Sequence, residues 1–139
     1  MTSELRNRGL FGLFGRRGRT VVWLVMVAAA FTLTHLPPAN LPIPAGLHDK
    51  TLHIVGFTGL GFFTLWRQAT GRRPLPGRLV LFWYFSLLTY AAFDEVTQPL
   101  TRRSCDVLDW CADAVGAMIG LAIVYMWHRR VIRASGNMS

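Results

Sequence analysis

Four apolar stretches, separated by charged residues and prolines, dominate the sequence, at residues 20–36, 51–66, 79–93 and 107–127. At 1.5 Å per residue, the first is about 25 Å long, close to the roughly 30 Å hydrocarbon core of a bilayer. The third continues without a helix-breaking residue to Gln98, directly before Pro99, which gives it a similar length. The pattern predicts an all-α fold, a polytopic membrane protein built as a four-transmembrane-helix bundle.

The basic residues predict which side of the membrane each end of the bundle faces. Of the 15 lysines and arginines, twelve precede the first stretch, join the second to the third or follow the fourth, and three lie in the other connections. Because basic residues accumulate on the cytoplasmic side, both termini are predicted to be cytoplasmic. Trp23, Trp66, Trp83 and Trp127 lie near the predicted inner ends and Trp110 near the outer, as interfacial tryptophans do.

Composition supports a membrane protein and weakens the alternatives. The chain is 52% hydrophobic and 16% charged, against about 25% charged in soluble domains. Its net charge of +8 would suit nucleic acid, but the charges flank apolar stretches, so no nucleic-acid partner is expected. A cleaved signal peptide is the alternative for the first stretch, although three further spans favour an anchor. The expected organisation is a basic cytoplasmic segment (1–19), a membrane domain (20–128, its core 49–120) and a cytoplasmic basic tail (129–139).

Polar residues gather at the predicted outer ends of the helices. On a helix from residue 107, Asp109, Asp113, Gly116 and Gly120 fall on one stripe with Asp106 before it, and the glycines would let another helix approach closely. Asp113 is therefore predicted to face protein, since an ionisable group at that depth needs a partner. In the second stretch Asp49, His53, Gly56 and Leu60 are expected to share an inward face.

This cluster supplies the candidate site. The catalytic candidates are His53, Glu95 and Asp113. The substrate-binding candidates are Asp49, Lys50, Asp94, Gln98, Arg103, Asp106 and Asp109. No metal ligand and no cofactor is assigned from the sequence, and Cys105 and Cys111 lack the paired spacing of a zinc site.

Plainer roles compete at several of these positions. Asp49 and Asp106 stand at predicted helix starts, where aspartate caps the helix. Lys50, Arg102 and Arg103 are suited to neutralising carboxylates or contacting phosphate headgroups. His35 and His48 are interpreted as interfacial residues.

The motifs in their order resemble the VanZ-like family over residues 49–120. They are DK-x2-H-x3-F-x2-L from Asp49, DE-x2-Q from Asp94, and R-x2-D-x2-DW-x2-D-x2-G-x3-G from Arg103. Asp113 departs from the family pattern, which often has asparagine there. The resemblance implies a link to low-level resistance to the glycopeptide teicoplanin and a place in the bacterial inner membrane.

Three classes of function stay open. The first is a factor that binds or acts on cell-envelope material, glycopeptide or lipid-linked, at the outer face. The second is a carboxylate or metal-dependent enzyme on a lipid-linked substrate. The third is a small ion-coupled carrier, which the apolar inner halves of the helices disfavour. The expected partner is the lipid bilayer, and the oligomeric state is left open.

Overall fold

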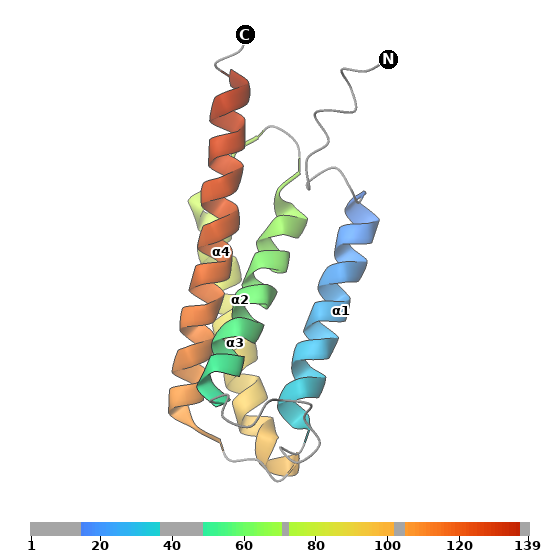
Figure 1. The fold of residues 1–139 in the computed structure, drawn as a ribbon, viewed down its shortest axis with the longest axis vertical. Helices are drawn as coiled ribbons and strands as arrows, with labels where there is room; N and C mark the ends of the chain where they lie inside the picture. Colours follow the sequence, from blue (N-terminus) through green and yellow to red (C-terminus); the bar gives the residue numbers. More distant parts are fainter. Residues whose placement is uncertain (1–14, 37–48, 71–72, 102–104, 137–139) are drawn as a thin grey trace.

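The computed structural model describes residues 15–36, 49–70, 73–101 and 105–136, and within these ranges all regular secondary structure is helical. Its elements are α1 (Arg16–His35), α2 (Asp49–Gln68), α3 (Gly77–Thr97), the short 3-10 helix η4 (Gln98–Thr101) and α4 (Val107–Gly136). The long helices alternate in direction (Figure 1). One end of the bundle therefore collects the last turns of α1 and α3 and the first turns of α2 and α4.

The outward faces of the bundle are apolar. Large hydrophobic side chains such as Leu24 on α1, Phe85 on α3 and Met118 on α4 are more than half exposed. Such a surface suits lipid rather than water, because soluble proteins rarely expose large contiguous apolar patches. Three helices are long and apolar enough to cross a membrane, over Arg16–His35, Gly77–Thr101 and Val107–Ser135.

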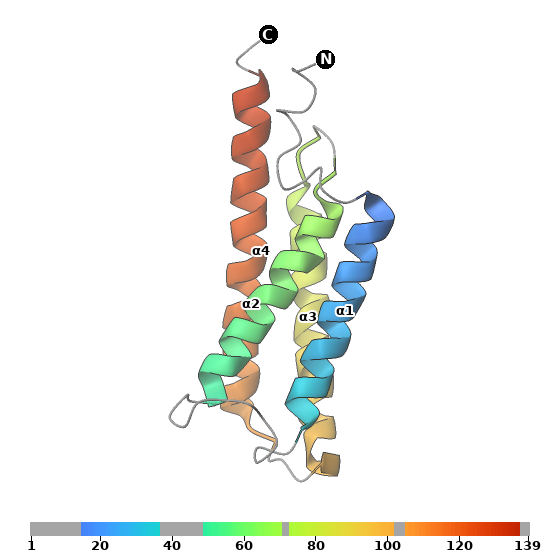
Figure 2. The ribbon, with the colours of Figure 1, turned by 45° about the vertical axis from the view of Figure 1, so that its right-hand side comes forward.

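Helix α2 is not among these three, so the fourth predicted span stays a prediction. It lies between α1 and α4 in both views (Figures 1 and 2) and packs on α4 more extensively than any other pair of helices. Of the large hydrophobic residues that are well exposed, α2 contributes Val55 alone within the described residues. An enclosed helix can carry glycine, threonine and histidine in place of lipid-facing leucines, which lowers its hydropathy.

Glycines set the close contact between α2 and α4. A Cβ at Gly61 would lie 2.7 Å from the carbonyl oxygen of Ala117, and one at Gly116 or Gly120 would collide with the α2 backbone at Ile54 or Thr58. The predicted small-residue stripe of α4 is thus the surface on which α2 packs. The expectation for Gly56 is wrong. It is exposed, and the buried face of α2 instead includes Phe57, Leu60, Gly61 and Thr64.

Arginines and tryptophans join the helices at the other end of the bundle. Arg19 Nη1 donates hydrogen bonds to the backbone carbonyls of Trp66 (3.3 Å) and Ala69 (2.9 Å). These carbonyls lie at the end of α2, where backbone acceptors lack a partner within the helix. The Arg67 guanidinium lies 4.3 Å from the ring centre of Trp23 and 5.3 Å from that of Trp83. These contacts tie α1, α2 and α3 together.

Candidate functional site

The centre of the candidate site is a buried pair, His53 on α2 and Asp113 on α4. The ring nitrogen Nδ1 of His53 lies 2.9 Å from Asp113 Oδ1, and the side chains are 2% and 0% exposed. Gly116, one turn after Asp113, lies close to the backbone of Ile54, which is next to His53. This close approach brings the two side chains to the same level of the bundle. Asp113 therefore faces protein, as its place on the stripe predicts.

Asp109 on α4 and Asp106, directly before this helix, join the pair to Lys50. The Lys50 ammonium donates to Asp109 Oδ1 at 2.8 Å and to Asp106 Oδ2 at 3.0 Å. The other Asp109 oxygen, Oδ2, lies 4.0 Å from His53 Nε2. Asp109 thus links the exposed lysine to the buried histidine.

Asp106 also begins α4, so its predicted capping role is present together with its ion pair. Its Oδ1 accepts a hydrogen bond from the backbone N–H of Leu108 at 2.8 Å, as a helix N-cap does. This bond, and then the Lys50 ammonium, lower the pKa of the Asp106 carboxyl below its usual value.

Glu95 connects α3 to the start of α4. Its Oε2 accepts from the backbone N–H of Asp106 at 2.9 Å, and its Oε1 accepts from Gln98 Nε2 at 3.0 Å. The Gln98 amide also donates to Asp94 Oδ2 at 3.3 Å. The side chains of Asp94, Glu95 and Gln98 are all buried. Helix α3 therefore adds two carboxyl groups to the site, each held in place by hydrogen bonds.

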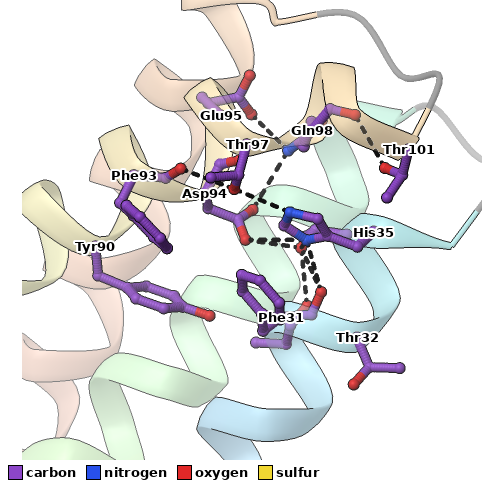
Figure 3. A network of polar contacts seen from close by, with 12 residues as sticks. Phe31, Thr32, His35, Tyr90, Phe93, Asp94, Glu95, Thr97, Gln98 and Thr101 are labelled. Carbon is purple, nitrogen blue, oxygen red and sulfur yellow. Dashed lines mark hydrogen bonds and ion pairs between the residues drawn. The ribbon is translucent and has the colours of Figure 1, made fainter.

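Asp94 extends the network to α1 (Figure 3). Its Oδ1 accepts from the Thr34 hydroxyl at 2.9 Å and lies 3.6 Å from His35 Nδ1. The other ring nitrogen of His35 is 2.9 Å from the Thr97 hydroxyl oxygen. The last turns of α1 and α3 are therefore joined by polar contacts.

Eight of the ten candidate residues meet in this connected cluster. They are Lys50, His53, Asp94, Glu95, Gln98, Asp106, Asp109 and Asp113. Asp49 is the first residue of α2, but its side chain lies outside the described part of the structure. His48, Arg102 and Arg103 lie outside the described residues altogether.

Sequence reasoning missed the contribution of α1. Thr34, His35 and Thr97 join the network, and His35 is more than the interfacial residue expected. The available signal was the position of Thr34 and His35 in the last turn of an apolar helix, at the end where the other polar residues gather.

Three of the clustered side chains are placed to hold a cation. One ligand atom each from His53, Glu95 and Asp109 lies within 4.8 Å of the others, and all three residues are buried. Imidazole and carboxylate are common ligands of divalent metals.

A cleft between α3 and α4 adjoins the cluster. Its volume is about 230 Å³, and its exposed wall is apolar, from Ala92, Val96, Val107 and Trp110 among others. Glu95 and Asp106 also line it, so Glu95 belongs to both the cleft and the buried cluster. The arrangement places an apolar cavity beside a polar centre.

The fold and this site define an all-helical protein with helices long and apolar enough to span a membrane and a buried polar cluster at one end of its bundle. The chain belongs to the VanZ/LLP1 family, whose family model matches residues 9–128 of the 139. Comparison with curated proteins and with solved structures gives no match.

Proposed function

We propose that this protein is a four-span protein of the bacterial inner membrane that binds a lipid-linked cell-envelope molecule at its outer face. His53, Glu95 and Asp113 form the polar centre, and Lys50, Asp94, Gln98, Asp106 and Asp109 orient it or contact the head group. Asp49 and Arg103 are proposed to contribute to binding as well.

The placement in the membrane is supported by charge and length. The 20 residues of α2 are about 30 Å long, enough to cross the hydrocarbon core. The basic residues concentrate at the end opposite the cluster, which favours a cytoplasmic position for that end and a periplasmic position for the cluster.

The observation that carries the proposal is the position of Glu95. Its side chain lines the apolar cleft and is also bonded into the polar cluster through Gln98 and the Asp106 backbone. A lipid-linked sugar likewise has an apolar part and a polar part. Its acyl or prenyl chain is suited to the cleft, and its hydroxyl groups can donate hydrogen bonds to carboxylates. A free sugar would leave the apolar cleft unused, and a simple lipid would make no use of the polar groups beside it.

Photo-crosslinking tests the proposal. The purified full chain in lipid nanodiscs is irradiated with a photoreactive polyprenyl-phosphate sugar, and labelled residues are identified by mass spectrometry. Labelling should concentrate on the cleft, and Ala92→Trp, which fills the cleft, should reduce it at least fivefold. Val115→Trp is the matched control, because Val115 is a partly exposed residue of α4 outside the cleft. Equal labelling of both variants, or labelling spread evenly over lipid-facing residues, would reject the proposal.

An enzyme acting on the same molecule is the second candidate. It is favoured by the 2.9 Å contact of His53 with Asp113, because an imidazole held in one orientation is suited to both base catalysis and metal ligation. Thin-layer chromatography of the lipid-linked sugar after incubation separates the two candidates. A time-dependent product that His53→Ala abolishes indicates an enzyme, and unchanged lipid indicates a binding protein.

A further inference from the structure

We infer that His53, Glu95 and Asp109 bind one divalent metal ion of the zinc class. These residues come from α2, α3 and α4, and their ligand atoms already lie within 4.8 Å of one another. Zinc bonds of about 2.0–2.2 Å at tetrahedral angles place ligand atoms on the order of 3.4 Å apart. A shift of about 1 Å, which side-chain rotation can supply, would close the triad around an ion.

The surroundings of two of the three ligands are already typical of a metal site. His53 Nδ1 contacts Asp113 Oδ1, and a proton on Nδ1 places the ring lone pair on Nε2, the nitrogen that faces Asp109. Metal-bound histidines almost always donate their other ring N–H to a carboxylate or carbonyl in this way. Asp109 Oδ1 is held by Lys50, and Oδ2 is the oxygen nearer to His53.

An independent observation points to a cation. The second oxygen of Asp113, Oδ2, is buried and has no hydrogen-bond partner among the residues that the structure describes. In the same part of the chain, the cluster holds five carboxyl groups (Asp94, Glu95, Asp106, Asp109 and Asp113), four of them buried, and Lys50 pairs with Asp106 and Asp109. Buried carboxyl groups that stay ionised need compensating positive charge. A divalent ion next to His53 would supply it.

The ligand set favours zinc over harder cations. Ca²⁺ and Mg²⁺ prefer sites made entirely of oxygen atoms, whereas one imidazole with two carboxylates suits Zn²⁺. Three protein ligands leave a fourth position open, as in zinc sites that bind substrate. An ion there would lie beside the cleft that Glu95 lines, where it could contact the phosphate of a lipid-linked molecule.

Zinc binding to the full-length chain tests the inference. Thiolates also bind zinc, so the parent protein carries Cys105→Ser and Cys111→Ser. Metal-stripped protein in nanodiscs is titrated with ZnCl₂ against a chromophoric chelator, and zinc-edge X-ray absorption is recorded on the loaded protein. We expect one equivalent bound in the micromolar range or tighter, with one imidazole and two or three oxygen ligands at about 2.0–2.2 Å.

Matched variants locate the ion. His53→Asn should weaken binding at least 100-fold, and Asp113→Asn, which acts through His53, should weaken it about 10- to 100-fold. His35→Asn is the control, because His35 lies at the same end beside Asp94 but outside the triad, and it should leave affinity unchanged. Absence of an imidazole from the absorption spectrum, binding weaker than 1 mM, or equal loss in the two histidine variants would overturn the inference. The absorption spectrum of the parent does not require the His53, Asp113 or His35 variant to fold.

The inference concerns the same cluster as the proposed function but does not depend on it. Zinc is titrated without the lipid-linked sugar, and crosslinking of that sugar is measured with and without a chelator. Failure of zinc binding with intact crosslinking rejects the metal alone, and the converse result rejects the lipid alone.

Discussion

His53 and Asp113 lie 60 positions apart in the chain, and their side chains meet at 2.9 Å in the interior of the bundle. The contact is possible because Gly116 lets α4 approach the α2 backbone at Ile54. A contact between two polar groups so well removed from solvent has a measurable energy, because neither group can recover its hydrogen bond from water.

A double-mutant cycle should detect this contact. His53→Ala and Asp113→Ala are each expected to lower the free energy of unfolding by about 1–3 kcal/mol, since each leaves the other polar group buried without its partner. The double variant should show an interaction energy of about 0.5–3 kcal/mol. Unfolding in mixed detergent micelles measures it. His53→Ala combined with Ser86→Ala is the control, and because Ser86 bonds to its own helix, additivity is expected. Additivity in the His53–Asp113 cycle would contradict the contact.

The α2–α4 contact predicts unequal tolerance of alanine at two glycines. Gly120→Ala places a methyl group against the backbone of Thr58 and Phe62, so the helices must separate, and a loss of about 1–3 kcal/mol is expected. A methyl group at Gly56 meets no atom within 4 Å, so Gly56→Ala should be neutral or stabilising by up to about 1 kcal/mol. Thermal unfolding of the two purified variants compares them, and equal effects would be inconsistent with this packing.

Arg19 predicts a stabilising contact at the other end of the bundle. Arg19→Ala removes the donor to the Trp66 and Ala69 carbonyls and the cation beside the Trp66 ring, 5.0 Å from its centre. A loss of about 1.5–3 kcal/mol is expected, as for hydrogen bonds to charged groups. Arg17→Ala is the control, because Arg17 is exposed, and it should change the melting temperature little. A similar decrease in both variants would indicate a general effect of charge.

The orientation in the membrane has its own test. A periplasmic reporter fused after Ala39 or Arg103 should be active, and one fused after Gly71 or Ser139 should be inactive, because basic residues concentrate near the latter two positions. All four fusion points lie outside the described residues. Alkaline phosphatase activity in intact cells measures the pattern, and the reverse pattern would move the polar cluster to the cytoplasm.

Membership of the VanZ/LLP1 family supports a physiological prediction. Overproduction is expected to change the inhibitory concentration of lipophilic glycopeptides such as teicoplanin in a host whose envelope they can reach. Broth dilution measures the change, with Asp113→Ala at matched expression as the control. An unchanged concentration across a panel of glycopeptides would count against a role in their tolerance.

Helical periodicity explains why much of the site was predictable. Asp106, Asp109 and Asp113 recur at intervals of three and four residues with Gly116 and Gly120, so one helix face carries both the carboxylates and the packing surface. The inward position of Asp113 follows from that pattern alone. The motif order likewise identified the family that the family model matches.

Contacts between helices explain what the sequence did not predict. The role of His35 depends on the last turn of α1 meeting the last turn of α3, which no local pattern encodes. Gly56 was misplaced because a residue three positions from His53 lies at the edge of the helix face, and the partner helix decides whether it is covered. The cation triad joins three helices, so no spacing within one of them could indicate it.

Helix α1 packs on the bundle through side chains that are only partly buried, such as Val22, Met26 and Val27. Arg19 is its only fully buried residue in the described part, and polar contacts at Trp23 and Thr34 link it to α2 and α3. Regions with little burial open at the lowest free energy, so α1 should be the first helix to separate. His53, Glu95 and Asp109 all lie on α2, α3 and α4. The three-helix unit left behind would keep the triad assembled and present a new lipid-accessible entrance beside it.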